Sequence, residues 1–104
     1  MTIYMQSTLE LRAGDTAKFE EVMKDLVATV EGVGWHLVTA IMQISGRLHT
    51  AIDVWSMPDL ESYQRGLGAL RGHERFPEMA RVLAETIERE TIVLGVEAPW
   101  VPQR

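Results

Sequence analysis

Residues 3 to 12 alternate between hydrophobic and polar positions, a period of two that predicts a strand with one buried face. The hydrophobic set, which we expect to face the core, comprises Ile3, Met5, Leu9 and Leu11 and is interrupted by Ser7. The polar set, which we expect on the opposite face, comprises Tyr4, Gln6, Thr8 and Glu10. Ala13-Gly14 then forms a turn.

After this turn the hydrophobic period lengthens to that of a helix. Hydrophobic side chains recur every three or four positions, at Phe19, Val22, Met23, Leu26, Val27 and Val30. Asp15 or Thr16 is expected to cap the N-terminus of this helix. Gly32 and Gly34 are expected to end it, because glycine tolerates the left-handed conformation found at helix C-termini.

A pair of strands is predicted next, over residues 35–44 and 47–56, joined by a hairpin-sized turn at Ser45-Gly46. The first of these strands is hydrophobic on both sides. In the second, the side chains expected to face the core are Leu48, Thr50, Ile52 and Val54. Those expected on the opposite face are His49, Ala51, Asp53 and Trp55.

Two helical segments and a last strand complete the chain. Pro58 suits the first turn of a helix, since it has no N–H to leave unbonded. The hydrophobic stripe of this helix comprises Leu60, Tyr63, Leu67 and Leu70. A break is expected near Gly72-His73, and a second helical piece around Pro77. Residues 89–96 are predicted to form the fourth strand, with Ile92, Leu94 and Val96 toward the core. Residues 97–104 are expected to be an irregular tail.

The predicted order is β-α-β-β-α-α-β within a single domain spanning residues 1–104. This order is typical of the α+β ferredoxin-like fold, a four-stranded antiparallel sheet with helices on one face. The spatial strand order in that fold is 4-1-3-2, so the first and third strands are neighbours. Their non-core sides therefore share the open face of the sheet.

The open face is expected to be too hydrophobic to remain in water. The second strand is predicted to add Trp35, Leu37, Thr39, Ile41 and Gln43 to it, and the fourth Thr91 and Val93. Monomeric proteins seldom expose apolar patches above roughly 300–600 Å². The commonest cover is a second copy of the chain, which predicts a homodimer that forms a dimeric α+β barrel and encloses a cleft between its two sheets.

Composition narrows the functions further. The 104 residues carry a formal net charge of −5, and no three basic residues are adjacent, which argues against binding nucleic acid or an anionic membrane. There is no cysteine, and the three histidines match no metal-binding spacing, so we expect no metal. The N-terminus does not resemble a signal peptide, and no apolar stretch approaches about 20 residues. The expected location is therefore the cytoplasm.

The candidate site residues are those predicted near the centre of the covered open face. Asp53 is a candidate general base, because burial would raise its pKa toward neutrality. His49 is a second candidate base. The candidate ligand-binding residues are Tyr4, Gln6, Thr8, Trp35, Thr39 and Trp55. A structural role, in which Asp53 is hydrogen-bonded across the dimer seam, is the alternative for this group.

Two segments of the chain resemble a known family. LHTAIDVWSMPDL places a tryptophan at a strand end before a leucine-bearing helix start, and IYMQSTLELRAGDTAKFEE combines a strand, a glycine turn and a helix with an early phenylalanine. Both are similar to NIPSNAP-type proteins of the dimeric α+β barrel superfamily, on Gly14, Phe19, Trp55 and Leu60. The resemblance covers nearly all of residues 2–96. Where the family often has histidine before its tryptophan, this chain has Asp53.

The resemblance implies the fold and the dimer, and leaves two function classes open. One is a dimer that binds a small apolar or aromatic molecule in the cleft between the sheet and its dimer partner. The other is an enzyme of the superfamily's cofactor-free kind, a monooxygenase, cyclase or isomerase with Asp53 or His49 as general base. Neither class requires a cofactor.

Overall fold

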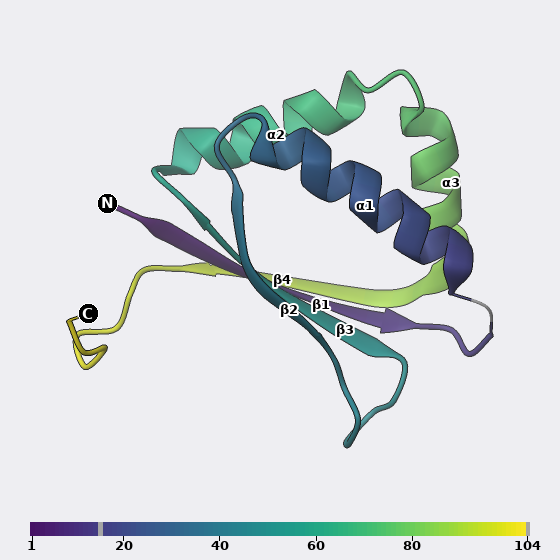
Figure 1. Ribbon diagram of the computed structural model, residues 1–104, viewed down its shortest axis with the longest axis horizontal. Helices are drawn as coiled ribbons and strands as arrows, with labels where there is room; N and C mark the ends of the chain where they lie inside the picture. The colour runs from purple at the N-terminus through teal and green to yellow at the C-terminus, as the bar shows by residue number, and fades with distance from the viewer. Residues whose placement is uncertain (15, 104) are drawn as a thin grey trace.

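The computed structural model describes residues 1–14 and 16–103, which form one sheet and three helices (Figure 1). The elements are β1 (Ile3–Leu11), α1 (Ala17–Glu31), β2 (His36–Met42), β3 (Thr50–Met57), α2 (Leu60–Arg71), α3 (Phe76–Thr86) and β4 (Ile87–Gly95). The strands pair antiparallel in the order β2-β3-β1-β4. The predicted α+β ferredoxin-like fold and its strand order are confirmed.

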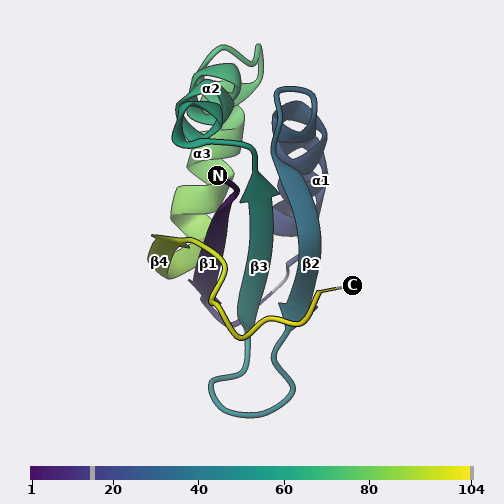
Figure 2. The same ribbon diagram turned by 90° about the vertical axis from the view of Figure 1, so that its left-hand side faces the viewer.

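The three helices cover one face of the sheet and leave the other open (Figure 1). Seen from one end, α1 lies over the β2–β3 side and α2 and α3 over the β1–β4 side (Figure 2). No helix among the described residues is long and apolar enough to cross a membrane. The described part of the tail, residues 97–103, contains no helix or strand, as predicted.

The ends of α2 and α3 lie where the sequence predicts them, except that α2 starts later than expected. The break after α2 is confirmed, with Gly72 at its C-cap, and Pro77 lies in the first turn of α3. Pro58, however, precedes α2 rather than starting it. Asp59 is the N-cap, and its Oδ1 accepts a hydrogen bond from the Ser62 N–H over 2.8 Å. A carboxylate at this position satisfies an N–H that the helix itself leaves free, so the helix begins after it.

The ends of α1 agree with the prediction in part. Thr16 is the N-cap, without a side-chain bond to the backbone, and the alternative cap Asp15 lies outside the described residues. Gly32 is the C-cap but keeps a right-handed conformation. The left-handed turn falls on Gly34, whose φ is 108°. Glycine is therefore needed at the second of the two positions rather than the first.

The connection between β2 and β3 is longer than predicted. Strands expected over 35–44 and 47–56 are shortened to His36–Met42 and Thr50–Met57. The intervening loop is closed by a hydrogen bond from the Gln43 N–H to the Thr50 carbonyl over 2.9 Å. Arg47 holds the loop to the sheet, since its Nε lies 3.1 Å from a carboxylate oxygen of Glu10.

Strand β1 has the predicted faces. Met5, Ser7, Leu9 and Leu11 are buried beneath the helices, and Tyr4, Gln6 and Thr8 lie on the open face. Strand β4 agrees for Ile92 and Leu94, which pair with Ser7 and Met5 and share their face. The strand runs from Ile87 to Gly95 rather than over 89–96, so Val96 lies beyond it. The core position expected for Val96 is wrong, because it is 56% exposed and lines a pocket with Tyr4 and Gln6 of the open face. Both strands alternate clearly enough for one side to be assigned to the core.

Strand β3 has its faces reversed relative to the prediction. Directly paired residues of an antiparallel sheet point to the same side. Asp53 pairs with Ser7 and Trp55 pairs with Met5, and both partners lie beneath the helices. The residues of β3 that face the helices are Ala51, Asp53, Trp55 and Met57. Those on the open face are Thr50, Ile52, Val54 and Ser56.

The reversal has a physical reason in the composition of β3. Both of its faces carry hydrophobic side chains, so alternation alone does not decide between them. Ile52 and Val54 look like a core pair, and Asp53 looks like a polar break. Trp55 has a far larger hydrophobic surface than Val54, and only 2% of it is exposed. Burial of this ring outweighs the cost of bringing Asp53 under the helices with it.

Strand β2 divides its expected residues between the two faces. A bulge between Leu37 and Thr39 shifts its register on β3. Leu37 pairs with Trp55 and thus faces the helices, whereas Thr39 pairs with Val54 on the open face. Trp35, just before the strand, is buried against Trp55. The open-face positions expected for Trp35 and Leu37 are wrong, and those expected for Thr39 and Ile41 are confirmed.

An aromatic cluster joins the sheet to α2. The Trp35 ring meets Trp55 edge-to-face, with centroids 5.4 Å apart, and stacks on Tyr63 at 5.7 Å. Its Nε1 donates to the Ser62 carbonyl over 2.6 Å. Gly66 is required beneath the ring, because a Cβ there would lie 2.2 Å from it. These contacts fix the inner wall of the space between the sheet and the helices.

Candidate functional site

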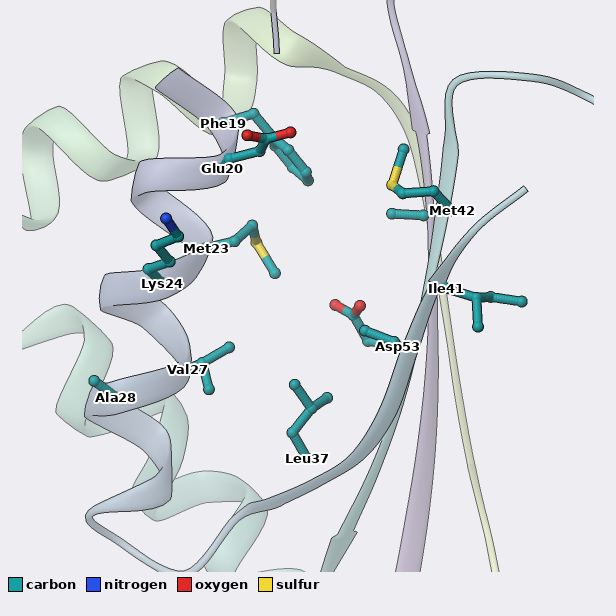
Figure 3. Close-up of a pocket in the computed structure, with 12 residues that line it drawn as sticks. Phe19, Glu20, Met23, Lys24, Val27, Ala28, Leu37, Ile41, Met42 and Asp53 are labelled. Atoms are coloured by element: carbon teal, nitrogen blue, oxygen red, sulfur yellow. The ribbon is translucent and has the colours of Figure 1, made fainter. Parts of the chain in front are cut away.

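A cleft of about 510 Å³ opens between α1 and the edge of the sheet formed by β2 and β3. Its lining is mostly hydrophobic, and Glu20 and Lys24 are exposed residues of α1 that border it. Figure 3 shows Met23 and Val27 of α1 pointing across the cleft toward Leu37 and Asp53 of the sheet. The other lining residues are Phe19, Ala28, Ala40, Ile41, Met42 and Ala51. A space of this size matches ordinary small-molecule sites, which span about 300–1,000 Å³.

Asp53 is the polar group at the inner wall of this cleft. Its residue surface is only 5% exposed. Among residues 1–14 and 16–103, no hydrogen bond or ion pair reaches its carboxylate, which points from β3 toward α1 (Figure 3). Burial raises the pKa of Asp53 above its ordinary value, because the charged form loses its water. No polar side-chain atom of the described residues is both fully buried and without a partner, so the Asp53 oxygens are accessible from the spaces that Asp53 lines.

Ser7 is a second polar residue in this apolar layer. It is the cross-strand partner of Asp53 and is 6% exposed. No side-chain hydrogen bond of Ser7 is found within the described part of the chain. A hydroxyl and a carboxyl group therefore lie side by side under the helices. The sequence signal for Ser7 was the interruption of the hydrophobic side of the first strand.

A smaller cavity, which we call the inner cavity, lies beneath α2 and α3 and shares the lining residues Met23 and Asp53 with the cleft. Its volume is about 200 Å³. Trp35, Trp55 and Tyr63 line it together with Ser7. The remaining lining residues are Met5, Leu9, Met23, Leu26, Asp53, Leu67, Leu70, Leu83, Ile87, Glu90 and Ile92. The cleft and the inner cavity together occupy the space between the two layers of the fold.

The sheet separates the predicted site residues into two groups. Asp53, Trp35 and Trp55 lie on its helix-covered side, contrary to their expected place on the open face. The residues that remain on the open face are Tyr4, Gln6, Thr8 and Thr39. Tyr4, Gln6 and Thr8 therefore cannot donate to Asp53 within one chain. The Tyr4 hydroxyl instead donates to Glu97 of the tail over 3.4 Å.

His49 does not join either group. It lies in the loop before β3 with a φ of 60°, is exposed, and lines neither the cleft nor the inner cavity. Its carbonyl accepts a hydrogen bond from the Leu11 N–H over 2.8 Å. The structure therefore brings no second titratable base to Asp53 from this position.

The chain is an α+β protein of ferredoxin-like fold with a polar pair, Ser7 and Asp53, inside the space between its layers. This version of the fold is also found in a NIPSNAP family protein from Agrobacterium tumefaciens, with a TM-score of 0.81 at 18% identity over 100% of both chains. An uncharacterized NIPSNAP domain protein from Burkholderia xenovorans gives 0.76 at 19% identity, over 99% of this chain and 100% of the other.

A third similar structure is SnoaB, a cofactor-independent oxygenase from Streptomyces nogalater. Its TM-score is 0.75 at 16% identity, over 98% of each chain. No family model matches the sequence, and no curated protein sequence does either. The resemblance to NIPSNAP-type proteins is thus confirmed at the level of the fold.

Proposed function

We propose that this protein binds a small apolar or aromatic molecule in the cleft between α1 and the sheet. The Asp53 carboxylate accepts a hydrogen bond from the molecule's polar group. The observation that carries the proposal is a carboxylate without a protein partner, on a residue only 5% exposed, at the inner wall of a mostly hydrophobic cleft. The site differs from the one first expected, because it lies between the layers of one chain and not between the sheet and a dimer partner.

The energetics favour a ligand that supplies one O–H or N–H donor. A hydrogen bond to a charged group contributes roughly 1.5–3 kcal/mol, more than a bond between neutral groups. Hydrophobic residues on both walls favour a ligand body that is aromatic or aliphatic. An anionic ligand is disfavoured near Asp53, because the two charges would repel each other in a poorly hydrated site.

The proposal predicts a difference between two ligands of nearly the same shape. 2-Naphthol carries a donor hydroxyl and naphthalene does not, so 2-naphthol is expected to bind wild-type protein at pH 7 about tenfold more tightly. Asp53→Asn keeps the shape of the side chain and removes its charge. It is expected to abolish most of this tenfold advantage while leaving naphthalene affinity unchanged. Isothermal titration calorimetry measures both affinities.

Glu61→Gln is the matched control, because it makes the same carboxylate-to-amide change on a side chain that is 88% exposed. It is expected to bind both ligands like the wild type. Equal affinities of wild-type protein for the two ligands would contradict the role of Asp53. Failure of both ligands to bind would contradict the cleft as a ligand site.

A catalytic role of the same carboxylate is the second candidate function. A carboxylate with a raised pKa in a hydrophobic site is a stronger base than one in water, and it can remove a proton from a bound carbon or oxygen acid. The fold shared with SnoaB, a cofactor-independent oxygenase, supports this candidate. The enzyme would be a cofactor-free monooxygenase, cyclase or isomerase, with Asp53 rather than the exposed His49 as its base.

A homodimer joined through the open face of the sheet is also part of the proposal. Ile41 and Val93 on this face are 52% and 56% exposed, and Ile52 and Val54 lie between them on the central strand. A stable interface needs about 1,200 Å² of total buried area. We expect light scattering at micromolar concentration to give twice the chain mass of 11.7 kDa.

Paired substitutions locate the dimer interface. Ile52→Glu places a charge at the centre of the open face and is expected to give monomers. Ile44→Glu makes the same change in the loop after β2, at a residue that is 95% exposed, and is expected to leave the dimer intact. A wild-type mass of one chain would refute the dimer, and dissociation by Ile44→Glu alone would place the interface elsewhere.

A further inference from the structure

We infer that the inner cavity is a second binding pocket, in series with the cleft, and that Met23 controls passage between them. The inference rests on the proposed function, since the body of the ligand would occupy the cleft beside Asp53. The inner cavity would then take a small apolar group, either the tail of the same molecule or a separate molecule about the size of benzene.

The geometry places two side chains at the division between the spaces. Met23 and Asp53 are the two residues that line both the cleft and the inner cavity. Met23 comes from α1 and Asp53 from β3, and Figure 3 shows the thioether of Met23 extending from the helix toward the carboxylate. A methionine side chain has three rotatable bonds and adapts to what it contacts. It can therefore fill the passage in one rotamer and widen it in another.

The lining of the inner cavity sets the chemistry of its occupant. Three aromatic rings and several leucine side chains form most of its walls. Its volume of about 200 Å³ exceeds that of an engineered apolar cavity of about 150 Å³ that binds benzene or xenon. Ser7 supplies one hydroxyl beside Asp53. The two spaces together fit an elongated molecule with a polar aromatic head and a short alkyl tail.

A pair of 4-alkylphenols tests this arrangement. 4-Methylphenol fits the cleft alone, whereas 4-pentylphenol has a tail that extends past Met23 into the inner cavity. Each buried methylene tightens binding by up to about fourfold. We define the tail ratio as the dissociation constant of 4-methylphenol divided by that of 4-pentylphenol. The wild-type tail ratio is expected to be about ten or more, and calorimetry measures it.

Substitutions of Met23 separate passage from general packing. Met23→Phe puts a stiff ring at the division and is expected to bring the tail ratio close to one. Because Met23 also lines the cleft, the readout is this ratio and not the affinity for either phenol alone. Met23→Ala widens the passage and is expected to keep the tail ratio at or above its wild-type value. Val27→Ala is the control, because Val27 lies one turn along α1 and lines the cleft but not the inner cavity. It is expected to keep the wild-type tail ratio.

Fluorescence gives a second readout, since Trp35 and Trp55 line the inner cavity. In a Trp100→Phe background, 4-pentylphenol is expected to change tryptophan emission more than 4-methylphenol does. The inference is overturned if 4-methylphenol binds but the wild-type tail ratio is near one, or if Met23→Phe weakens both phenols equally. Failure of 4-methylphenol itself to bind would instead overturn the proposed function, and the inference with it.

Discussion

Trp55→Ala is expected to lower the free energy of unfolding by about 3–5 kcal/mol, the range for truncating a large buried aromatic side chain. Trp55 is 2% exposed and lies on the central strand β3, where it packs edge-to-face against Trp35. Its removal would leave a hole continuous with the inner cavity, which backbone relaxation cannot close because β3 is paired on both sides. Urea unfolding followed by circular dichroism measures the change.

Trp100→Ala is the matched control for this prediction. Trp100 lies in the C-terminal tail and is 84% exposed, so the same substitution there is expected to change the free energy of unfolding by less than about 0.5 kcal/mol. Both variants are compared at one protein concentration, because the stability of a dimer depends on concentration. Similar midpoints for Trp55→Ala and the wild type would mean that the ring is not part of the core.

The topology of this fold could be predicted from the sequence because its elements have distinct periods. Residues 3–12 alternate with one polar face, and residues 17–31 repeat at helical spacing, so their types are unambiguous. The order of the seven elements then leaves few topologies, since short connections between adjacent elements exclude most others. The exact start of a helix is harder to predict than its existence. The start of α2 is an example, because Pro58 and Asp59 are both common at the beginning of a helix.

The face of β3 could not be predicted from alternation alone, because both of its sides carry hydrophobic side chains. Ile52 and Val54 on one side match Ala51 and Trp55 on the other in hydrophobic character. The register on β1, with Asp53 opposite Ser7, shows which side the helices cover. The same register explains why Ser7 interrupts a hydrophobic row. Ser7 and Asp53 lie opposite each other on neighbouring strands, so each interrupts the hydrophobic row of its strand at the same place. The polar residue in one strand therefore indicates where the polar residue of the other strand lies.

The candidate site was therefore predicted in its central residue but not in its location. Asp53 stands out in the sequence, whereas Met23 does not, since a methionine at helical spacing is ordinary core material. Its position between two cavities depends on how far α1 stands from the sheet, which no local pattern encodes. The reversal of β3 also changes the open face, which gains Ile52 and Val54 and loses Asp53 and Trp55. Trp35 and Leu37 leave the open face as well, but Ile41, Ile52, Val54 and Val93 keep it hydrophobic on three strands, which supports the proposed dimer.

The ring opening of 5-nitrobenzisoxazole is expected to be accelerated by wild-type protein and to lose at least about 100-fold in rate with Asp53→Asn. In this reaction a base removes the C3 proton as the N–O bond breaks, and the products are a coloured cyanonitrophenolate and the protonated base. The substrate is small, aromatic and uncharged, as the cleft requires. General bases positioned in this way contribute about 10²–10⁴-fold.

The pH dependence assigns the base. Only the deprotonated carboxylate removes a proton, so the rate is expected to rise with pH through the pKa of Asp53 and then level off. Because burial raises that pKa, the midpoint is expected above the ordinary value of 3.8 for an aspartate. His49→Gln is the control, and it is expected to retain the wild-type rate and midpoint. A midpoint at or below 3.8 would mean that the carboxylate is fully hydrated, and it would remove Asp53 as a base. If His49→Gln lost the rate and Asp53→Asn kept it, the base would be His49, in the exposed loop before β3.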